Sequence, residues 1–406
     1  MELNYLTLDD FDLRDKRVLL RLDINAPLDP TTNQILDDTR IVSARPTLDA
    51  LNQARVVVMS HQSRPGKEDF TSLQQHAAIL QKNCSQQVHF IDDVMGPAAR
   101  DAIKRTKRGE VLVLDNVRFC SEENLEDKGE KLAKTNLVSR LASMFNLYVN
   151  DAFATAHRAQ ASLVGFPQVL PSAAGRLMEK ELAALKKVLE RPDRPSTLIL
   201  GGAKIEDKVP VIDNILSTGK ADRVLVGGNV AKAFLKAGGH KLNDADEEML
   251  AKAKEQVEKA KSILASHHSR VVMPTDFGTL ERGKRIETPI SKLTGAGKCL
   301  DIGEETSEKF LGIIRESKTV VASGPMGVFE QDGFEIGTKV ILEGMADSDA
   351  FTVIGGGHLA GYAGIMGIAE SFSHVSTAGG AMLSLLAGEE LPAIEALVEA
   401  ARRNRK

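Results

Sequence analysis

Short runs of β-branched and aliphatic residues alternate with helical stretches along most of the chain. The first half contains RVLLRLD from residue 17, ARVVVMS from 54, EVLVLDN from 110 and LYVND from 147. The second half contains STLILGG from 196, RVLVGGN from 223, RVVMPTDF from 270, TVVASGP from 319 and FTVIGGG from 351. Continuous apolar strands separated by helices are typical of parallel sheets covered on both faces. The pattern therefore predicts an α/β protein with two doubly wound, Rossmann-like domains.

A segment rich in Pro, Ser and Gly, FPQVLPSAAG from residue 166, separates the two sets of strands. MEKELAALKKVLE from 178 follows it with apolar residues at helical spacing. We therefore expect an N-terminal domain over residues 1–172 and a C-terminal domain over 173–388, joined by a hinge and a connecting helix. Residues 389–406 predict a C-terminal helix with a basic end, which we expect to close the second domain.

Composition agrees with two globular domains. The chain has 406 residues, more than one hydrophobic core usually accommodates, and 42% of them are hydrophobic and 27% charged. No stretch approaches the roughly 18 uncharged apolar residues of a membrane helix, and the first residues are acidic where a secretory signal is basic. We expect a cytoplasmic protein with no membrane partner. Cys84, Cys120 and Cys299 are widely spaced, which favours reduced, structural thiols.

The formal net charge of −4 argues against a nucleic-acid partner, whose affinity would depend on many Lys and Arg contacts. A small anionic substrate needs only a local basic pocket. Ligands of open α/β sheets bind outside the carboxyl ends of the strands, so the residues that follow each strand are the candidates.

In the first half, these positions carry cations and hydrogen-bond donors. They are Asp23 and Asn25, His61 and Arg64, Asn116 and Arg118, Asp151, and then His157 and Arg158, with Arg40 at a predicted helix start. Arginine binds phosphate and carboxylate in a bidentate manner, so the set suits a compact ligand that carries both groups. Because the neighbours of His61 and His157 are Arg and Ser, we expect no metal bound by the protein here.

In the second half, the strand ends are glycines: Gly201 and Gly202, Gly227 and Gly228, Gly324, Gly355 to Gly357, and Gly379 and Gly380. Glycine lets backbone N–H groups approach phosphates, and Lys204 and Lys208 lie one turn apart after the first pair. This pattern predicts a nucleotide site. The Walker pattern is absent, because GGAKIEDK lacks the second glycine before its lysine.

Several longer strings occur in one order: RLDINAP, SHQSRP, LDNVRF, NDAFATAHRAQAS, LMEKEL, ILGGAKIEDKV, SGPMGVFE, TVIGGGH and SHVSTAGGA. Together they resemble the phosphoglycerate kinase family from about residue 17 to about residue 392. The resemblance implies reversible phosphoryl transfer from 1,3-bisphosphoglycerate to ADP, giving 3-phosphoglycerate and ATP, in glycolysis and gluconeogenesis. It also implies hinge-bending closure of two domains, with phosphoglycerate on the first and MgADP or MgATP on the second.

The family's functional residues carry over position by position. The resemblance assigns the phosphoglycerate site to Asp23, Asn25, Arg40, His61, Arg64, Arg118 and Arg158. It makes Arg40 and Lys204 catalytic, and it assigns nucleotide contacts to Gly202, Ala203, Lys208, Gly227, Gly228, Glu330, Gly356, Gly357, His358 and Leu359. Glu330 is expected on the ribose, and Gly202, Ala203, Gly227 and Gly228 are expected to line the adenosine pocket.

Two positions depart from the family pattern. Many members have Trp-Asn where this chain has Ala322-Ser323, and Asp-Thr after the triple glycine where it has His358-Leu359. Because the metal-linked aspartate is missing, we expect Mg²⁺ to be bound mainly by nucleotide oxygens and water. Histidine at position 358 resembles the archaeal branch of the family.

Two other functions remain open from the residues themselves. A nicotinamide-dependent dehydrogenase is favoured by two α/β domains and a loose Gly-x-Gly fingerprint at Gly355, and tight NADH binding without ADP binding would identify it. A catalytically silent scaffold would explain the losses at Ala322-Ser323 and His358. The retained Arg40, Lys204 and arginine cluster argue against the scaffold.

Overall fold

The computed structural model of the chain describes residues 4–405, which form two compact units. The first unit extends to Leu182 and includes the stretch from Glu390 onward, and the second runs from Ala183 to Glu389. The division falls inside the connecting helix α7 (Arg176–Glu190), ten residues later than the expected boundary at 172. Met178, Leu182, Leu185 and Val188 are buried at helical spacing, so the apolar stripe of α7 continues across the division.

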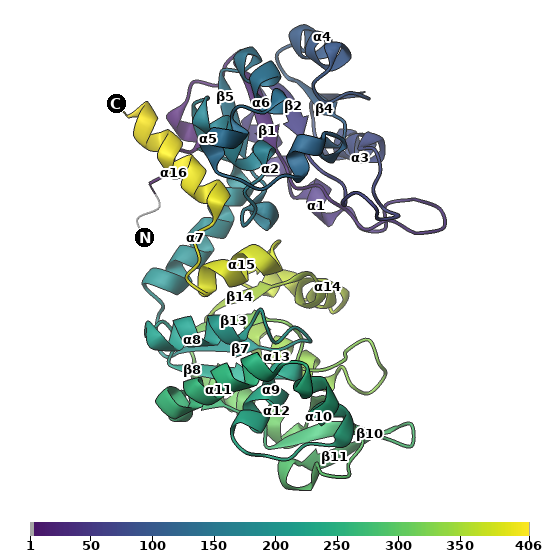
Figure 1. Cartoon of the computed structure of the whole chain (residues 1–406), viewed down its shortest axis with the longest axis vertical. Coiled ribbons are helices and arrows are strands. Elements are labelled where there is room, and N and C mark those ends of the chain that lie inside the picture. The colour runs from purple at the N-terminus through teal and green to yellow at the C-terminus, as the bar shows by residue number, and fades with distance from the viewer. Residues whose placement is uncertain (1–3, 406) are drawn as a thin grey trace. The chain divides into compact units, whose positions relative to one another are not determined.

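The first unit is built on a parallel sheet of six strands in the order β3-β4-β2-β1-β5-β6 (Figure 1). The strands are β1 (Arg17–Arg21), β2 (Arg55–Met59), β3 (Gln87–Ile91), β4 (Glu110–Leu114), β5 (Leu147–Asn150) and β6 (Ser172–Ala174). The main helices are α1 (Thr39–Val42), α2 (Arg45–Ala50), α3 (Gln74–Asn83), α4 (Pro97–Arg105), α5 (Gly129–Leu132) and α6 (Asn136–Leu141). The strand order reverses between β1 and β5, which places a ligand crevice at their carboxyl ends.

The second unit contains another parallel sheet of six strands, in the order β15-β14-β13-β7-β8-β9. The strands are β7 (Ser196–Leu200), β8 (Arg223–Val226), β9 (Val271–Val272), β13 (Thr319–Ser323), β14 (Phe351–Gly355) and β15 (His374–Ser376). The helices are α8 (Val209–Ser217), α9 (Gly228–Ala237), α10 (Asp244–Ala251), α11 (Lys254–His267), α12 (Glu304–Glu316), α13 (Ile336–Ala346), α14 (Gly357–Ile365) and α15 (Gly379–Leu386). Two doubly wound domains are confirmed, and here the order reverses between β7 and β13.

A second, antiparallel sheet in this unit was not expected from the sequence. It has the order β11-β10-β12, with β10 (Asp276–Glu281), β11 (Lys284–Pro289) and β12 (Lys298–Ile302). The run RVVMPTDF, which was interpreted as one strand, divides between β9 and β10 around Pro274. Proline has no N–H for a ladder hydrogen bond, so the strand ends before it.

The C-terminal helix α16 (Pro392–Asn404) was expected to close the second domain, and this expectation was wrong. It belongs to the first unit and not to the second, and Figure 1 shows it in yellow beside α5. Its apolar face, which includes Ile394 and Leu397, is buried, and Ala393 N–H donates to Ala156 O over 3.1 Å. An amphipathic pattern predicts that one face of a helix is buried, but it does not identify the surface that covers it.

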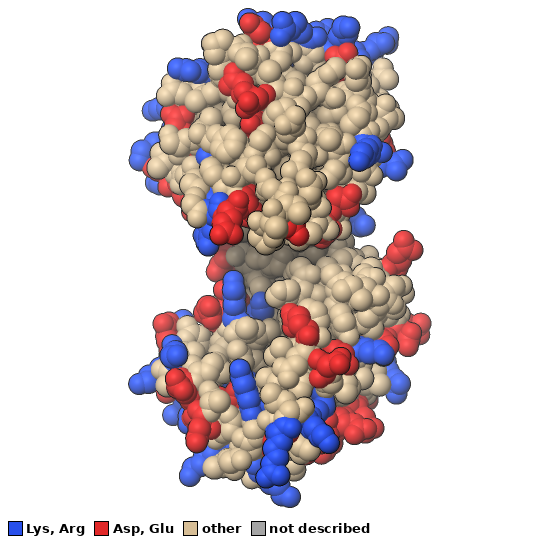
Figure 2. Space-filling model, turned by 90° about the vertical axis from the view of Figure 1, so that its right-hand side faces the viewer, with Lys and Arg blue, Asp and Glu red and all other residues tan. Residues whose placement is uncertain are grey.

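Acidic and basic side chains are interspersed on the face drawn in Figure 2. Within residues 4–405, no helix combines the length and apolar character needed to cross a membrane.

Candidate active site

The carboxyl ends of β1 and β2 bring together several residues predicted from the sequence. Asp23 is almost fully buried just after β1 and accepts a hydrogen bond from Arg40 Nη1 over 3.1 Å. Asn25 Oδ1 accepts from the Ser63 backbone N–H over 2.7 Å, which connects the loop after β1 to the loop after β2. Arg40 lies in the short helix α1 with a partly exposed side chain, so its guanidinium is oriented by Asp23 and is still accessible.

His61 is buried close to these residues, beside Arg21. Burial and the charges of Arg21, Arg118, Arg158 and Arg40 lower the pKa of His61 well below its ordinary value. Arg21 Nη2 lies 3.3 Å from His61 Nδ1, and a guanidinium can only donate. Nδ1 is therefore the acceptor, and the neutral ring carries its proton on Nε2, where it can donate to an anionic oxygen.

Arg118 and Arg158 also belong to the cluster. Arg118 Nη1 donates to Ser63 O, and burial together with Arg158 and Arg21 lowers the pKa of Arg118 to about 10. Among the described residues, the Nε atoms of both arginines are buried without a hydrogen-bond partner. Arg64 follows Ser63 directly, and its side chain is exposed. Packed cations with unsatisfied donors suit a small anion, because an anion would satisfy the donors and neutralise the charge.

Two strand-end residues noted in the sequence, Asn116 and Asp151, form hydrogen bonds with other parts of the protein. Asn116 is fully buried, and its Nδ2 donates to Gln62 O over 2.8 Å and to Thr71 O over 2.9 Å. Asp151 is fully buried and accepts from Thr47 Oγ1 over 2.5 Å and from Met178 N–H over 3.0 Å, at the start of α7. Their side chains stabilise loops and a helix end.

Sequence reasoning missed Arg21, which lies fully buried beneath the cluster. Its Nε donates to Ser162 Oγ over 2.8 Å, and Ser162 Oγ in turn donates to Glu123 Oε1 over 2.6 Å. Burial raises the pKa of Glu123, while Arg21 acts in the opposite direction. An arginine within the apolar run RVLLRLD was the available signal, because a buried charge requires a partner.

The second unit has a pocket of about 540 Å³ at the point where its strand order reverses. The predicted residues that line it are Gly202, Ala203, Lys204, Lys208, Gly228, Glu330, Gly356, Gly357, His358 and Leu359. Gly202 N–H donates to Pro325 O over 2.7 Å, which joins the loops after β7 and β13. Gly227 lies behind the wall, where an added Cβ would meet Met326 Sδ at 2.5 Å.

Lys204 and Lys208 both line this pocket and differ in burial. Lys204 is exposed, whereas Lys208 is almost fully buried. Burial lowers the pKa of Lys208, the neighbouring carboxylate of Asp207 opposes the shift, and Lys204 adds to it. Gly356 at the N-cap of α14 has a φ of 98°, in the region that favours glycine, and the helix N-terminus behind it suits a phosphate.

The pocket is also lined by Glu330, on the loop after β13, and by His358, in the first turn of α14. The His358 ring is centred 6.0 Å from the Phe329 ring. No cluster of His, Cys, Asp or Glu side chains suited to a metal ion occurs within residues 4–405. The carboxylates that line the pocket are Asp207, Asp301 and Glu330.

Two further lining residues were not predicted. Lys232 is buried, and its Nζ donates to Asp246 Oδ1 and to Cys299 O, each over 2.7 Å. Asp301 lies on the antiparallel strand β12, and burial raises its pKa to about 6 against the opposing effect of Arg285. The strand-end rule applies to parallel sheets, so it could not identify Asp301.

Comparison with known proteins identifies the family. The family profile described as phosphoglycerate kinase matches residues 8–389. A phosphoglycerate kinase of Methanobacterium bryantii is 45% identical over 410 residues, covering 100% of both chains. The crystal structure of phosphoglycerate kinase from Pyrococcus horikoshii has a TM-score of 0.91 and 40% identity, and it covers 98% of this chain and 99% of its own. A Coxiella burnetii phosphoglycerate kinase has a TM-score of 0.80 and 33% identity, covering 98% and 100%.

The fold and the named relatives identify the class of the protein: it is a phosphotransferase built from two α/β domains. The chain belongs to the phosphoglycerate kinase family. It is a glycolytic kinase that transfers a phosphoryl group reversibly between 1,3-bisphosphoglycerate and ADP. The resemblance to archaeal members is confirmed by curated relatives that are mostly archaeal, and the dehydrogenase and scaffold alternatives are wrong.

Proposed function

We propose that the basic end of the first sheet binds the phosphoglycerate. The residues in this proposal are Asp23, Asn25, Arg40, His61, Arg64, Arg118 and Arg158. The observation that carries it is the burial of His61 among four arginines, two of which have buried Nε atoms without a partner. Bidentate arginines match both the phosphate and the carboxylate of this substrate, and the His61 Nε2–H adds a neutral donor.

The pocket of the second unit binds ADP or ATP in this proposal. Gly202, Ala203 and Gly228 contact the adenosine, with Gly227 supporting the wall behind them, and Glu330 accepts from the ribose. Lys208 and the turn from Gly356 to Leu359 contact the phosphates. Supporting this orientation, Lys204 and Lys208 line the same pocket as the N-terminus of α14.

Mg²⁺ accompanies the nucleotide and neutralises part of the phosphate charge. Asp301 already accepts hydrogen bonds from Arg285 and from the Gly337 N–H. The residue after the triple glycine is His358, and imidazole suits softer ions than Mg²⁺. Asp207, Asp301 and Glu330, the carboxylates of the pocket, belong to no cluster suited to a metal ion within the described residues, so the residues present fit a metal bound mainly by nucleotide oxygens and water, as Mg²⁺ commonly is in kinases.

Arg40 and Lys204 act on the transferring phosphoryl group. Phosphoryl transfer depends on positioning and on donors that stabilise the charge of the equatorial oxygens. Because the substrate residues belong to one unit and the nucleotide residues to the other, we expect the domains to close during turnover. Closure would also exclude water, which could hydrolyse the acyl phosphate.

The test is a coupled assay with 3-phosphoglycerate and MgATP, combined with calorimetry of each ligand on folded variants. Arg118→Ala should weaken phosphoglycerate binding and leave MgADP binding unchanged, and Lys208→Ala should do the reverse. If Arg118→Ala weakened only the nucleotide, the assignment of the two sites would be wrong.

A further inference from the structure

Glu330 lies on a loop, Gly324–Glu335, that forms one wall of the nucleotide pocket between β13 and α13. Backbone contacts secure the first part of this loop. Met326 N–H donates to Thr338 Oγ1 over 3.0 Å, and Val328 N–H donates to Leu300 O over 2.7 Å. Glu330 itself is exposed, so its position depends on how the second part of the loop is fixed.

The Asp301 carboxylate lies against Gly327 in the first part of the loop and against the first turn of α13, which follows the loop. Its side chain is fully buried, Oδ2 accepts from Gly337 N–H over 2.7 Å, and Oδ1 accepts from Ile302 N–H over 2.9 Å. A Cβ added to Gly327 would lie 2.4 Å from Oδ1, and one added to Gly337 would lie 2.5 Å from it. Both glycines therefore leave the space that the carboxylate occupies, and the loop is packed directly on Asp301.

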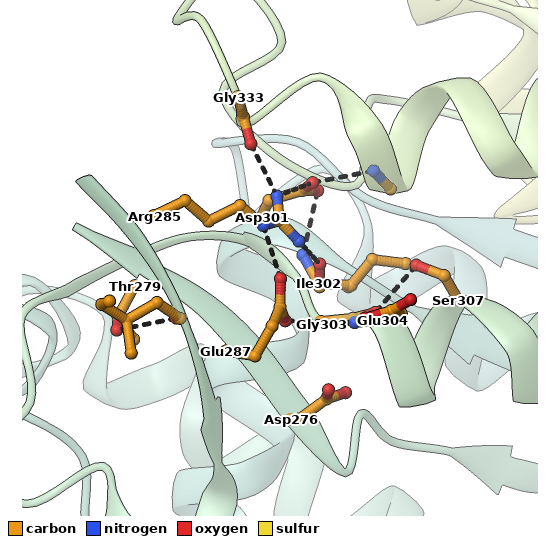
Figure 3. A network of polar contacts seen from close by, with 12 residues as sticks. Asp276, Thr279, Arg285, Glu287, Asp301, Ile302, Gly303, Glu304, Ser307 and Gly333 are labelled. Atoms are coloured by element: carbon orange, nitrogen blue, oxygen red, sulfur yellow. Dashed lines mark hydrogen bonds and ion pairs between the residues drawn. The ribbon is translucent and has the colours of Figure 1, made fainter.

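Arg285 of β11 fixes Asp301 and the loop at the same time (Figure 3). Nη1 donates to Asp301 Oδ2 over 2.8 Å and to Gly333 O over 2.9 Å. Nη2 donates to Ile302 O over 2.9 Å, and Nε donates to Glu287 Oε1 over 2.6 Å. The side chain is only 12% exposed, so these four acceptors hold the guanidinium in a single orientation.

The antiparallel sheet thus has a connection to the nucleotide pocket. Its strands β11 and β12 bring Arg285 and Asp301 together, and Gly333 lies three residues after Glu330. Removing the Arg285 guanidinium would leave the buried Asp301 carboxylate without a compensating charge. The loop would then lose the hydrogen bond at Gly333 O and the fixed carboxylate on which Gly327 and Gly337 pack.

We propose that Arg285 and Asp301 are positioning residues for the nucleotide, which fix the loop Gly324–Glu335 so that Glu330 is presented to the ribose before the nucleotide binds. The inference rests on the proposed ribose contact of Glu330. Neither residue need touch the nucleotide; they act by limiting the conformations of the loop and so reduce the entropy lost on binding.

The experiment measures MgADP binding by calorimetry on the full chain. In Arg285→Met, the dissociation constant for MgADP should rise about tenfold. The reason is that the proposed hydrogen bond between the ribose and the Glu330 carboxylate would be weakened. Phosphoglycerate binding should stay at the wild-type value. The control is Lys284→Met at the neighbouring, exposed position of β11, which should bind both ligands normally. Arg285→Lys, which retains the charge but not the planar fork, should give an intermediate loss and replaces the methionine variant if circular dichroism shows that variant to be unfolded.

A double-mutant cycle with Glu330→Ala separates positioning from general stability. If Arg285 acts through Glu330, Arg285→Met should cause little further loss in the Glu330→Ala background. Wild-type affinity in folded Arg285 variants, or the full tenfold loss in both backgrounds, would overturn the inference. Normal MgADP binding by Glu330→Ala alone would instead overturn the ribose contact of the proposed function, and the inference with it.

Discussion

Arg64 and Arg118 follow strand ends within the same cluster but lie in different environments. Arg118 is buried and hydrogen-bonded to protein groups, whereas the Arg64 side chain is exposed on the loop after β2. Replacing Arg118 would therefore disturb packing as well as its proposed ligand contact, whereas replacing Arg64 would affect only the proposed contact.

We predict that Arg64→Ala weakens phosphoglycerate binding by about tenfold or more, because a charge-assisted hydrogen bond to the substrate is lost. Calorimetry with 3-phosphoglycerate measures the effect. Arg45→Ala, an exposed arginine of the same unit, is the matched control and should bind normally. Unchanged affinity in folded Arg64→Ala would remove this residue from the site.

His358 provides a second prediction. We expect the Mg²⁺ concentration for half-maximal activity at fixed ATP to change by less than about threefold in His358→Ala, because imidazole is a poor ligand for Mg²⁺. His358→Asp, which introduces the carboxylate of other family members, should lower that concentration. A large rise in the alanine variant would show that His358 takes part in binding the metal.

Asp151 gives a prediction for stability against pH. Burial raises its folded pKa to about 6, above the ordinary value of 3.8, so the folded state retains the proton over this interval. Its contribution to the free energy of unfolding is full below about pH 4 and is lost as pH rises through about 6. Relative to Asp151→Asn, the wild type should lose about 3 kcal/mol between these limits. Urea unfolding across this range tests it, with exposed Asp49→Asn as the control; a constant difference would contradict the prediction.

At the level of elements, α16 shows how the end of the chain contributes to the first unit. Leu397 is fully buried on the face that packs there. We predict that Leu397→Ala destabilises the first unit by about 2–5 kcal/mol, through lost burial and the cavity left behind. Hydrogen exchange should then increase in the first unit and remain unchanged in α8 or α9. Exposed Arg402→Ala should have no such effect, and faster exchange confined to the second unit would refute the assignment.

The repeated elements of the two sheets could be predicted because buried parallel strands appear as continuous apolar runs. The antiparallel sheet could not, since KRIETP of β11 is mostly exposed and has no apolar run. For the same reason Arg285 was missed: an arginine in a polar segment is ordinarily solvated, and only the fold brings it to Asp301. The glycine-rich strand ends were found because their role depends on local backbone position.

At the level of the whole molecule, the roles proposed for the two units rest on the residue types that each unit brings together. Cations with unsatisfied donors gather at the first sheet, and glycines with two lysines line the pocket of the second. The sequence predicted this polarity, because both patterns follow directly after strands. The apolar run around Arg21 signals that this arginine is buried, but the sequence could not identify His61 as its neighbour, because only the fold brings the two side chains together.

Arg40 and Lys204 belong to different units and, in the proposed function, act together only during phosphoryl transfer. An interaction made in the transition state but not in the ground state changes kcat, whereas uniform binding changes KM. By analogy with lost oxyanion donors and arginine fingers, Arg40→Ala or Lys204→Ala should lower kcat on the order of 10² to 10⁵. KM for both substrates should change far less.

Steady-state kinetics with both substrates varied, beside circular dichroism, tests this expectation. Arg45→Ala and Lys252→Ala are matched controls, because both side chains are exposed and lie outside the proposed sites. In the structure Arg40 is oriented by Asp23, so Asp23→Asn should produce a smaller fall in kcat, in the same direction as Arg40→Ala. A near-normal kcat in either alanine variant would exclude that residue from the transfer step, because a group that stabilises the transferring phosphoryl cannot be removed without raising the barrier.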